Sequence, residues 1–428
     1  MKKFFVNILL LACSLSVFSL FAQNKKQNAS FDNFIKKGMT EWQIPGLTVS
    51  VIQKGQVLFS GAYGITSLES KTQVRNDTRF MIGSTTKAMT AFGLALLVED
   101  GKIGWDDPVI LHLPEFRLKD PWVTREITIR DLLVHHAGLG NADFLWFIRD
   151  ISPTEIVSKL ELIEPAYSFR NGWVYQNIMY GVAGQVIERV SGLSWAEYMK
   201  KRIFNPLGMF RTVPLSEERL KDENYVKPHY KIDGKISEID GIYAGKVAPA
   251  GDVWSTIVDM SKWAAFLLDS CKLNGKRMVS EKIYKELFTP QNIVPPSQYY
   301  PTMVLTNPRW TTYALGWFQQ DYRGKALSFH TGSLPGLIAI IGLVPDEDFG
   351  VVVMGNLDHA ELRHAIMLKA IDLYLEKDDS RDWLREIYDL YDVFEKPNPQ
   401  NIHGMVIWEG DLHHSVDSQA KYDLQDHK

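Results

Sequence analysis

Three short segments of the chain carry side chains that together could perform acyl transfer. Residues 84–87 (Ser-Thr-Thr-Lys) supply a nucleophilic hydroxyl and an amine that could accept its proton. Residues 175–177 (Tyr-Gln-Asn) add a phenol and an amide, and residues 330–332 (His-Thr-Gly) add an imidazole beside a hydroxyl. Each segment alone is a weak signal, since residues 418–421 of the polar tail also fit Ser-x-x-Lys. Their combination predicts an active site that only folding can assemble.

Ser84 and Lys87 are predicted to lie at the start of a buried helix. Residues 88–98 contain almost no polar side chain, and Gly101 after them is typical of a helix end. Residues three apart share a helix face, so we expect Lys87 beside Ser84. A buried amine near a helix N-terminus loses its proton readily, which a general base requires. The alternative is a helix-capping serine with a surface lysine, but this helix is too apolar for the surface.

The other two segments have weaker local signals. Tyr175 precedes a predicted helix at residues 177–190, where an aromatic side chain usually packs with its hydroxyl bonded. His330 ends a predicted strand, and Gly332 would let a substrate backbone approach closely. Their value for catalysis depends on meeting Ser84 in the folded chain, which spacing alone does not show.

The outer parts of the chain are predicted to form a sheet, and the middle a helical lobe. Residues 46–59 are typical of a β-hairpin. Further strands are expected at residues 313–318, 326–329, 337–344 and 351–354. Short turns between them indicate antiparallel pairing, and a helix at residues 359–375 follows. Residues 105–310 have mostly helical patterns. We therefore expect an α/β (α+β) fold, an antiparallel sheet flanked by helices with an inserted, mostly helical lobe.

The two ends of the chain differ from its body. Two lysines precede an apolar run that ends at Ala22, which is typical of a secretory signal cleaved there. The alternatives are a lipid anchor at Cys13 and an uncleaved membrane anchor. No later segment has the roughly 20 apolar residues that a membrane span needs. Residues 379–428 are expected to form one more helix, at 383–394, and a solvated polar tail.

Charge and missing patterns exclude several classes of protein. The chain has 47 basic and 51 acidic residues, a formal net charge of −4, which becomes −6 without the two signal lysines. Such a balance gives no electrostatic reason to bind nucleic acid. Without Cys13, Cys271 cannot form an internal disulfide, so stability must come from a packed core. The absence of H-E-x-x-H and G-x-S-x-G disfavours a metallo-hydrolase and an α/β-hydrolase. We expect no metal and no cofactor.

Together these segments resemble the serine β-lactamase and penicillin-binding-protein superfamily, and most closely its class C-like branch. That branch includes β-lactamase-related serine hydrolases, D-aminopeptidases, carboxypeptidases and esterases. Three more stretches match motifs of that branch. Residues 132–139 match its LLxHxSGL turn, with Ala137 in place of Ser, and residues 206–209 match its PLGM motif. Residues 249–260 match its AGGLxST…DM motif. The resemblance covers residues 31–375. It implies a β-lactamase/transpeptidase-like domain at residues 23–378, between a signal at 1–22 and the segment 379–428.

The resemblance also implies a catalytic role for several residues. Ser84 would attack a carbonyl group and become acylated. Lys87 and Tyr175 would shuttle its proton, and which of them is the base stays open. Asn177 would orient Lys87 or a substrate amide. The backbone N–H groups of Ser84 and Ser333 would form the oxyanion hole.

Substrate binding is implied for His330, Thr331 and Gly332. Many relatives have Lys where this chain has His330, and that cation binds the carboxylate of penicillins and of D-Ala-D-Ala peptides. An unperturbed imidazole titrates near about 6.5 and is mostly neutral at pH 7. Relatives with His at this position are often esterases or peptidases.

The function expected from these features is an exported serine hydrolase, secreted or periplasmic, that forms an acyl-enzyme at Ser84. Its substrates would be peptides, esters or amides, as for a D-amino-acid peptidase or an esterase. One alternative is a true β-lactamase. Another, of a different class, is a penicillin-binding sensor that is acylated and does not turn over. Expected partners are small-molecule or peptide substrates, with no nucleic acid and no membrane span after signal removal.

Overall fold

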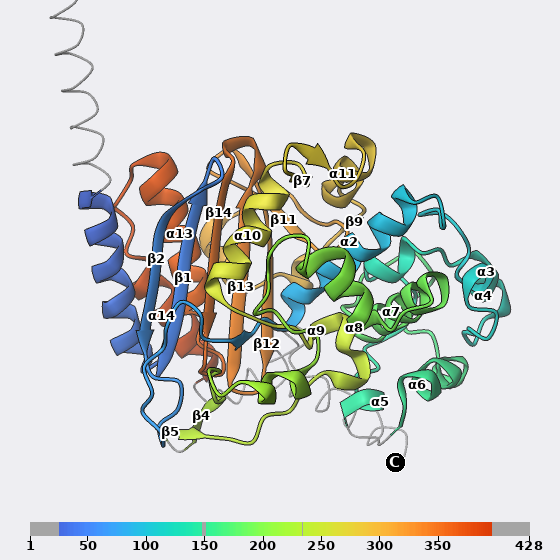
Figure 1. Ribbon diagram of the computed structural model, residues 1–428, viewed down its shortest axis with the longest axis horizontal. Coiled ribbons are helices and arrows are strands. Elements are labelled where there is room, and N and C mark those ends of the chain that lie inside the picture. Colours follow the sequence, from blue (N-terminus) through green and yellow to red (C-terminus); the bar gives the residue numbers. More distant parts are fainter. Residues whose placement is uncertain (1–24, 148–150, 233, 396–428) are drawn as a thin grey trace, which may run out of the picture.

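An eight-stranded antiparallel sheet forms one half of the molecule (Figure 1). The computed structural model describes residues 25–147, 151–232 and 234–395. The strand order is β2-β1-β14-β13-β12-β11-β10-β9, so the first strand pairs with the last. The bounds are Gly46–Gln53 (β1), Gln56–Gly64 (β2), Asn292–Ile293 (β9), Thr311–Tyr313 (β10), Phe318–Tyr322 (β11), Lys325–Leu334 (β12), Leu337–Val344 (β13) and Phe349–Gly355 (β14).

Three two-stranded pairs stand outside this sheet. They are β3 (Phe80–Met81) with β6 (Trp254–Ser255), β4 (His229–Ile232) with β5 (Lys235–Glu238), and β7 (Lys272–Leu273) with β8 (Lys276–Arg277). The β3–β6 pair directly precedes the turn that carries Ser84, and it ties that turn to the segment before α10 (Ile257–Leu268).

Both faces of the sheet are covered. Every residue of β13 is buried, because successive side chains enter opposite packing layers. Helix α10 covers one face, where Ser261 Oγ donates to Ser50 Oγ of β1 at 2.8 Å. Helix α13 (Leu362–Ile371), continued by a wider turn at Asp372–Glu376, covers the other face.

The two ends of the described chain meet beside the sheet. Residues 25–42 are helical and lie along β2 at the outer edge (Figure 1). The ring of Trp42 lies 5.6 Å, centroid to centroid, from the ring of Tyr388 in α14 (Trp383–Glu395). Trp383 is fully buried, and its indole N–H donates to Asp372 at 2.8 Å. Helix α14 is therefore packed against the body of the domain.

A lobe of short helices lies beside the sheet (Figure 1). Its helices are α3 (Val109–His112), α4 (Pro121–Glu126), α5 (Phe144–Phe147), α6 (Pro153–Lys159), α7 (Ile178–Ser191), α8 (Trp195–Met199) and α9 (Ala248–Gly251). Shorter turns occur at Asp131–Leu133, Leu160–Leu162, Lys200–Phe204, Ser216–Lys221 and Gly245–Val247. The remaining helices, α11 (Glu281–Phe288) and α12 (Met303–Thr306), precede β9 and β10. In the described part of the chain, no helix has both the length and the apolar character needed to cross a bilayer.

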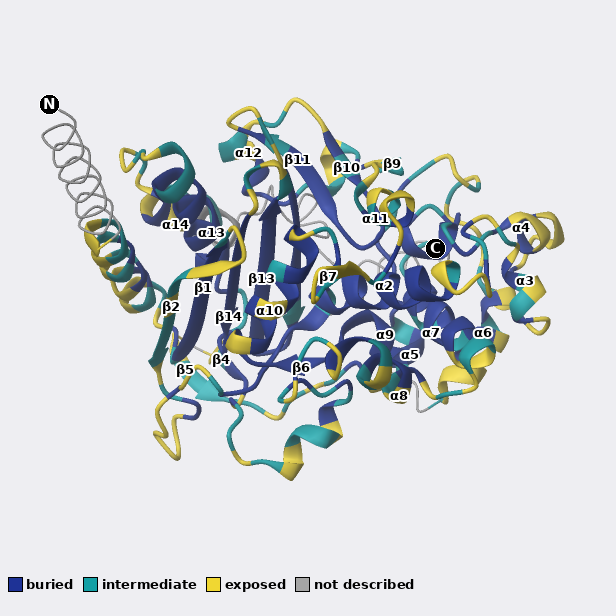
Figure 2. Ribbon diagram, turned by 45° about the horizontal axis from the view of Figure 1, so that its top comes forward, coloured by how far each residue is buried: buried dark blue, intermediate teal, exposed yellow. Residues whose placement is uncertain are grey.

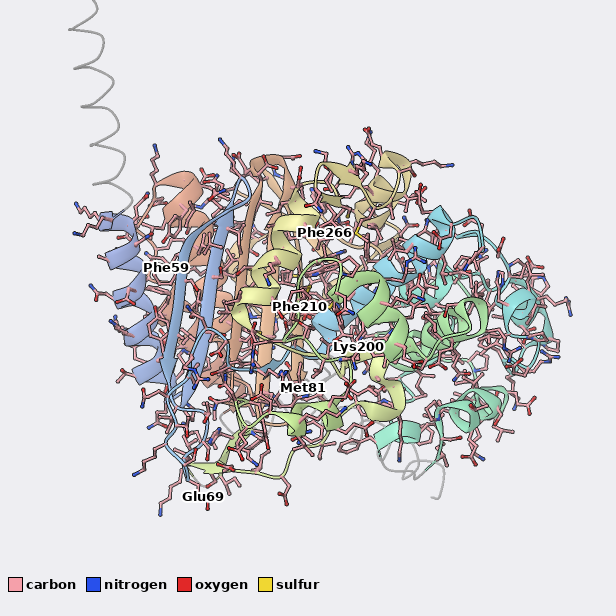
Figure 3. The ribbon with its side chains drawn as sticks, in the orientation of Figure 1. Phe59, Glu69, Met81, Lys200, Phe210 and Phe266 are labelled. Carbon is pink, nitrogen blue, oxygen red and sulfur yellow. The ribbon has the colours of Figure 1, made fainter. Side chains whose placement is uncertain are left out.

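Helix α2 (Thr86–Glu99) runs between the lobe and the sheet and is buried from its first residue to Leu97 (Figure 2). The Phe92 ring lies 5.7 and 5.3 Å, centroid to centroid, from the rings of Trp263 and Phe266 of α10. Phe266 is labelled in Figure 3. A helix that is apolar on all sides needs such packing on all sides, which confirms the prediction of a buried helix.

The predicted fold class is confirmed: an antiparallel sheet flanked by helices, with a helical lobe. The strand predicted at residues 313–318 is wrong, because β10 ends at Tyr313 and β11 begins at Phe318. The residues between them form a turn with Gly316 at φ +84°. A Cβ on Gly316 would lie 2.8 Å from the Ala88 backbone, so this turn packs on the start of α2.

The extent of the lobe differs from the expected range of residues 105–310. Helix α10 lies inside that range but packs on the sheet, and β9 joins the sheet edge. Periodicity indicates that one face of a helix is buried, but it does not identify the partner. The expected signal at residues 1–22 and the tail after residue 395 lie outside the described residues.

Candidate active site

Ser84 lies in a single 3₁₀ turn, Gly83–Thr85, that leads directly into α2. From Thr78 to Leu97 it is the one residue that is not buried. Ser84 lines a small pocket. The pocket is also lined by Trp146, Asn177, Ala244, Val247, Ala250, Gly251, Ser333 and Leu334. The hydroxyl is thus held on a rigid helix start and still reaches solvent.

The Lys87 amine contacts three oxygen atoms. Its Nζ lies 3.0 Å from Ser84 Oγ, 2.7 Å from Asn177 Oδ1 and 3.0 Å from the carbonyl oxygen of Ala250. A neutral amine has two hydrogens and one lone pair. The Asn177 and Ala250 oxygens only accept, so they take the two hydrogens. The lone pair is then directed at the Ser84 hydroxyl.

Burial favours this neutral form of Lys87. The side chain is fully buried, and loss of hydration lowers its pKa well below the usual value. The Asp143 carboxylate acts in the opposite direction. The Nζ also lies 4.7 Å from the ring centroid of Tyr175. The amine is therefore surrounded by aromatic carbon and by acceptors that it can satisfy without a charge.

The pKa of Tyr175 is shifted in the opposite direction to that of Lys87. Its ring is buried, and burial raises the pKa of the phenol well above its usual value, with Tyr300 adding to the effect. Interaction with the Ser84 hydroxyl lowers this pKa in part. At neutral pH the phenol therefore keeps its proton and is suited to donate it.

His135 holds the segment that carries Tyr175. Its backbone has φ +62°, and its carbonyl oxygen accepts the Val174 N–H at 3.0 Å. Its Nδ1 accepts the Gln176 N–H at 3.1 Å. The sequence placed His135 in a turn shared with related proteins but gave it no part in the site.

Asn177 connects Lys87 to a carboxylate that the sequence did not identify. Its Nδ2 donates to Asp143 Oδ2 at 2.8 Å, while its Oδ1 accepts from Lys87. Asp143 is buried at the start of α5 and also accepts the Trp146 indole N–H at 2.9 Å. The geometry thus places Asn177 in contact with both Lys87 and Asp143.

The turn of Ser84 lies directly against the end of β12. A Cβ on Gly83, which has φ +49°, would lie 2.8 Å from the Ser333 nitrogen. A Cβ on Gly332 would lie 2.0 Å from the Ile82 carbonyl oxygen. Both positions therefore require glycine, and the close approach brings Ser84 and Ser333, whose backbone N–H groups the resemblance implied as an oxyanion hole, to the lining of one pocket. Two such N–H groups beside a nucleophile can stabilise an oxyanion.

Arg363 supports this strand from behind. It is fully buried and donates to the Gly332 carbonyl oxygen at 2.9 Å and to Ser333 Oγ at 2.7 Å. Glu361 pairs with it at 2.8 Å. Burial alone would raise the pKa of Glu361, but Arg363 and His364 hold it below its usual value. Glu361 thus neutralises the charge of Arg363, while the hydrogen bonds of the guanidinium hold the backbone at Gly332 and the side chain of Ser333.

His330 is placed differently from the substrate-binding role that the resemblance implied. The ring is fully buried, with Nδ1 bonded to the Thr331 carbonyl oxygen at 2.6 Å. Nδ1 therefore carries the proton, and Nε2 accepts the Tyr313 O–H at 2.9 Å. Burial, with a contribution from Lys87, lowers the pKa of His330 to about 3. Neither ring nitrogen is available to a substrate carboxylate in this arrangement.

Thr331 and Gly332 also differ from the expected substrate contacts. Both Thr331 and Tyr300 are buried, and their hydroxyl groups are 2.6 Å apart. Tyr300 lies in the segment that precedes α12. The open side of Gly332 faces Ile82 rather than the pocket. Residues 330–332 of β12 therefore pack against the turn that carries Ser84. The register of β12 directs the side chains of His330 and Thr331 into the core.

Comparison with known proteins identifies the family of this chain. The family model Beta-lactamase matches residues 31–376. The chain belongs to the beta-lactamase family. The matched range contains the Ser84 turn, α7 and β12, so all three segments of the site lie within the beta-lactamase domain.

Individual relatives of this beta-lactamase-family chain are distant. It is 28% identical over 391 residues to the Unguisins hydrolase ungD of Aspergillus violaceofuscus, covering 85% of this chain and 68% of that protein. It is 25% identical over 346 residues to Protein flp of Staphylococcus aureus, covering 76% of this chain and 62% of that protein. The octameric penicillin-binding protein homologue from Pyrococcus abyssi aligns with a TM-score of 0.71 and 25% identity, covering 81% and 77% of the two chains. The protein is a serine hydrolase of the β-lactamase-related type.

Proposed function

We propose that this beta-lactamase-family protein is an exported hydrolase that cleaves peptide, amide or ester bonds through an acyl-enzyme at Ser84. The observation that carries the proposal is the environment of Lys87. Two fixed acceptors take the hydrogens of a neutral amine and leave its lone pair for the Ser84 hydroxyl. Export is proposed from the apolar run that ends at Ala22.

In the first step, the Ser84 hydroxyl passes its proton to Lys87 as Oγ forms a bond to the substrate carbonyl carbon. The carbonyl electron pair moves to oxygen, where the N–H groups of Ser84 and Ser333 stabilise it. Collapse of this intermediate breaks the bond to the leaving group, which takes up a proton from Tyr175, and Lys87 passes the proton it accepted back to Tyr175. Water then attacks the acyl carbon: its OH becomes part of the released acid, and its other proton passes to Ser84 Oγ as the acyl bond breaks.

Lys87 is the better candidate for the base of the first step. Burial lowers the pKa of Lys87 and raises that of Tyr175, so it favours the neutral amine and the neutral phenol. Removing a proton from Ser84 requires a free lone pair, which the amine has. The phenol is suited to the opposite transfer, toward the leaving group.

The pocket favours uncharged acyl groups over substrates with a carboxylate next to the reacting bond. All described residues that line the pocket are uncharged. The nearby cation Arg363 is buried and paired with Glu361, and the His330 imidazole is neutral. A peptidase or esterase therefore fits better than a β-lactamase, whose substrates carry that carboxylate.

Active-site labelling followed by hydrolysis assays tests the proposal. A fluorescent fluorophosphonate should label the wild type and should not label Ser84→Ala. Purified protein should then hydrolyse p-nitrophenyl esters or D-amino-acid amides with higher kcat/KM than a cephalosporin. Equal labelling of both proteins would rule out Ser84 as nucleophile. Labelling without turnover of any substrate would instead identify an acylated sensor. N-terminal sequencing of the protein from the producing cells tests export and cleavage near Ala22.

A further inference from the structure

Asp143 is a buried carboxylate one residue removed from Lys87 in the hydrogen-bond network. Only 1% of its surface is exposed. Its two oxygens accept from Asn177 Nδ2 at 2.8 Å, from the Trp146 indole at 2.9 Å and from Asn141 Nδ2 at 3.3 Å. The Asp143 backbone N–H donates to Asn141 Oδ1 at 2.9 Å. The carboxylate is therefore held from several sides and aimed at the Asn177 amide.

The contact determines which way the Asn177 amide faces. A carboxylate only accepts hydrogen bonds, so the NH₂ group of Asn177 has to face Asp143. The amide oxygen then has to face Lys87, where it accepts one of the two hydrogens of the neutral amine. With the reverse orientation, the NH₂ group would face Lys87 and would bind to its lone pair. That lone pair would no longer be free to accept the Ser84 proton.

We propose that Asp143 is a positioning residue that acts through the Asn177 amide to direct the lone pair of Lys87 at Ser84. This proposal rests on the proposed acyl-enzyme function, since it concerns the proton acceptor of that reaction. Asp143 touches neither Ser84 nor a substrate atom. It acts on the reaction by fixing which end of the Asn177 amide, the oxygen or the NH₂ group, faces Lys87.

The charge of Asp143 gives the proposal a second, separate readout. The carboxylate raises the proton affinity of Lys87, against the larger effect of burial. The other titratable groups that act on Lys87 or contact it are His135, Tyr175, Tyr180 and His330. They come from the turn before α5, the start of α7 and strand β12, and the two imidazoles are neutral. Loss of the Asp143 charge should therefore lower the pKa of Lys87.

The experiment compares Asp143→Asn with the wild type, using a fluorophosphonate as the probe of Ser84 and a p-nitrophenyl ester as substrate. An asparagine has the same shape but can donate as well as accept, so the Asn177 amide is free to reverse. The rate of Ser84 labelling should fall about 10- to 100-fold, as expected for a misdirected reacting group. The acid limb of the pH profile of kcat/KM should move to lower pH.

A matched control separates positioning from folding. Asp131 is another buried carboxylate of the lobe, bonded to His136 and Arg170 and not to the Lys87 network. Asp131→Asn should lower the melting temperature without moving the acid limb. In a background of Asn177→Ala, addition of Asp143→Asn should cause no further loss of labelling rate, because the amide through which Asp143 acts is gone.

The outcomes distinguish this proposal from the proposed function. Absence of labelling in the wild type would overturn the proposed function, and the role of Asp143 with it. Rapid labelling of the wild type and equally rapid labelling of Asp143→Asn would overturn the role of Asp143 alone. So would an additive loss in the Asn177→Ala background, or an acid limb that stays in place.

Discussion

The imidazole of His135 lies 4.4 Å from the ring of Tyr175, centroid to centroid, at an angle of 35°. The peptide N–H groups on both sides of Tyr175 are bonded to the same histidine, one to its carbonyl oxygen and one to its ring. The phenol that contacts Ser84 is thus held by backbone and by stacking. Its position depends on a residue from a different segment of the lobe.

His135→Leu should reduce kcat for ester hydrolysis by about tenfold or more, with a smaller change in KM. Leucine fills much of the space but removes the acceptor for the Gln176 N–H and the flat surface under Tyr175. Steady-state kinetics on a p-nitrophenyl ester measure the effect. His229→Leu is the matched control, since His229 is equally buried but bonds to Asn356. An equal loss of kcat in both variants would contradict a specific effect on Tyr175.

His330 should stay neutral between about pH 5 and 8, because its pKa is lowered to about 3. We therefore expect no protonation of His330 near pH 6.5. The ratio of kcat/KM for an anionic ester to kcat/KM for a neutral ester should stay constant as the pH falls through 6.5. A His330→Lys variant should lose stability rather than gain affinity for carboxylates, because the new ammonium would be buried near Lys87. A ratio that climbs toward pH 5 and becomes flat in His330→Gln would show that the imidazole does bind anionic substrates.

Stability should fall as the medium is acidified from pH 7.5 to 5. A histidine that is neutral in the folded state but titrates near about 6.5 when unfolded binds its proton only in the unfolded state over this interval. The unfolded state is therefore favoured as pH falls from about 6.5 toward the folded pKa. For His330, with a folded pKa of about 3, the loss at pH 5 is about 2 kcal/mol. Denaturant unfolding of the wild type and of His330→Gln measures it, and equal slopes with pH would contradict it.

Trp383→Ala should destabilise the domain by about 3–5 kcal/mol, as is usual for a fully buried tryptophan. The indole fills the space between α14 and the sheet and donates to Asp372. Chemical denaturation gives the free energy of unfolding. Trp122→Ala is the comparison, since 54% of that side chain is exposed and the change should cost roughly 0.5 kcal/mol or less. Similar effects in the two variants would show that α14 contributes little to the body of the domain.

The sequence was sufficient for the parts of the site that lie on regular elements. Lys87 in the first turn of α2 lies 3.0 Å from Ser84 Oγ in the preceding 3₁₀ turn, and the apolar pattern of residues 88–98 correctly predicted that α2 is buried. Alternating and apolar runs likewise predicted β1, β2 and β13. In each case the spacing of apolar residues along the chain is enough to predict the element, because the face on which those residues recur is the face that packs.

The parts that were missed depend on contacts between distant segments. Asp143 follows a loop without periodicity, so nothing in the sequence indicates that it faces Asn177. His135 acts through a left-handed backbone and a ring stack, neither of which leaves a pattern. The direction of His330 depends on the register of β12 against β13, since a shift by one residue would turn the ring to the other face.

The pairing of β1 with β14 has a consequence for how the chain reaches its active form. The strand made first pairs with β2 early, but its second partner, β14, is made only when the ribosome has nearly finished the domain. The Ser84 turn likewise meets β12 only late in synthesis. Such long-range contacts are slow to form, because loop closure precedes any stabilising contact. Folding should therefore be largely post-translational. Under the proposed mechanism, an unfinished chain would have Ser84 but not the Ser333 N–H, so it should be inert toward acyl donors until its last strands are in place.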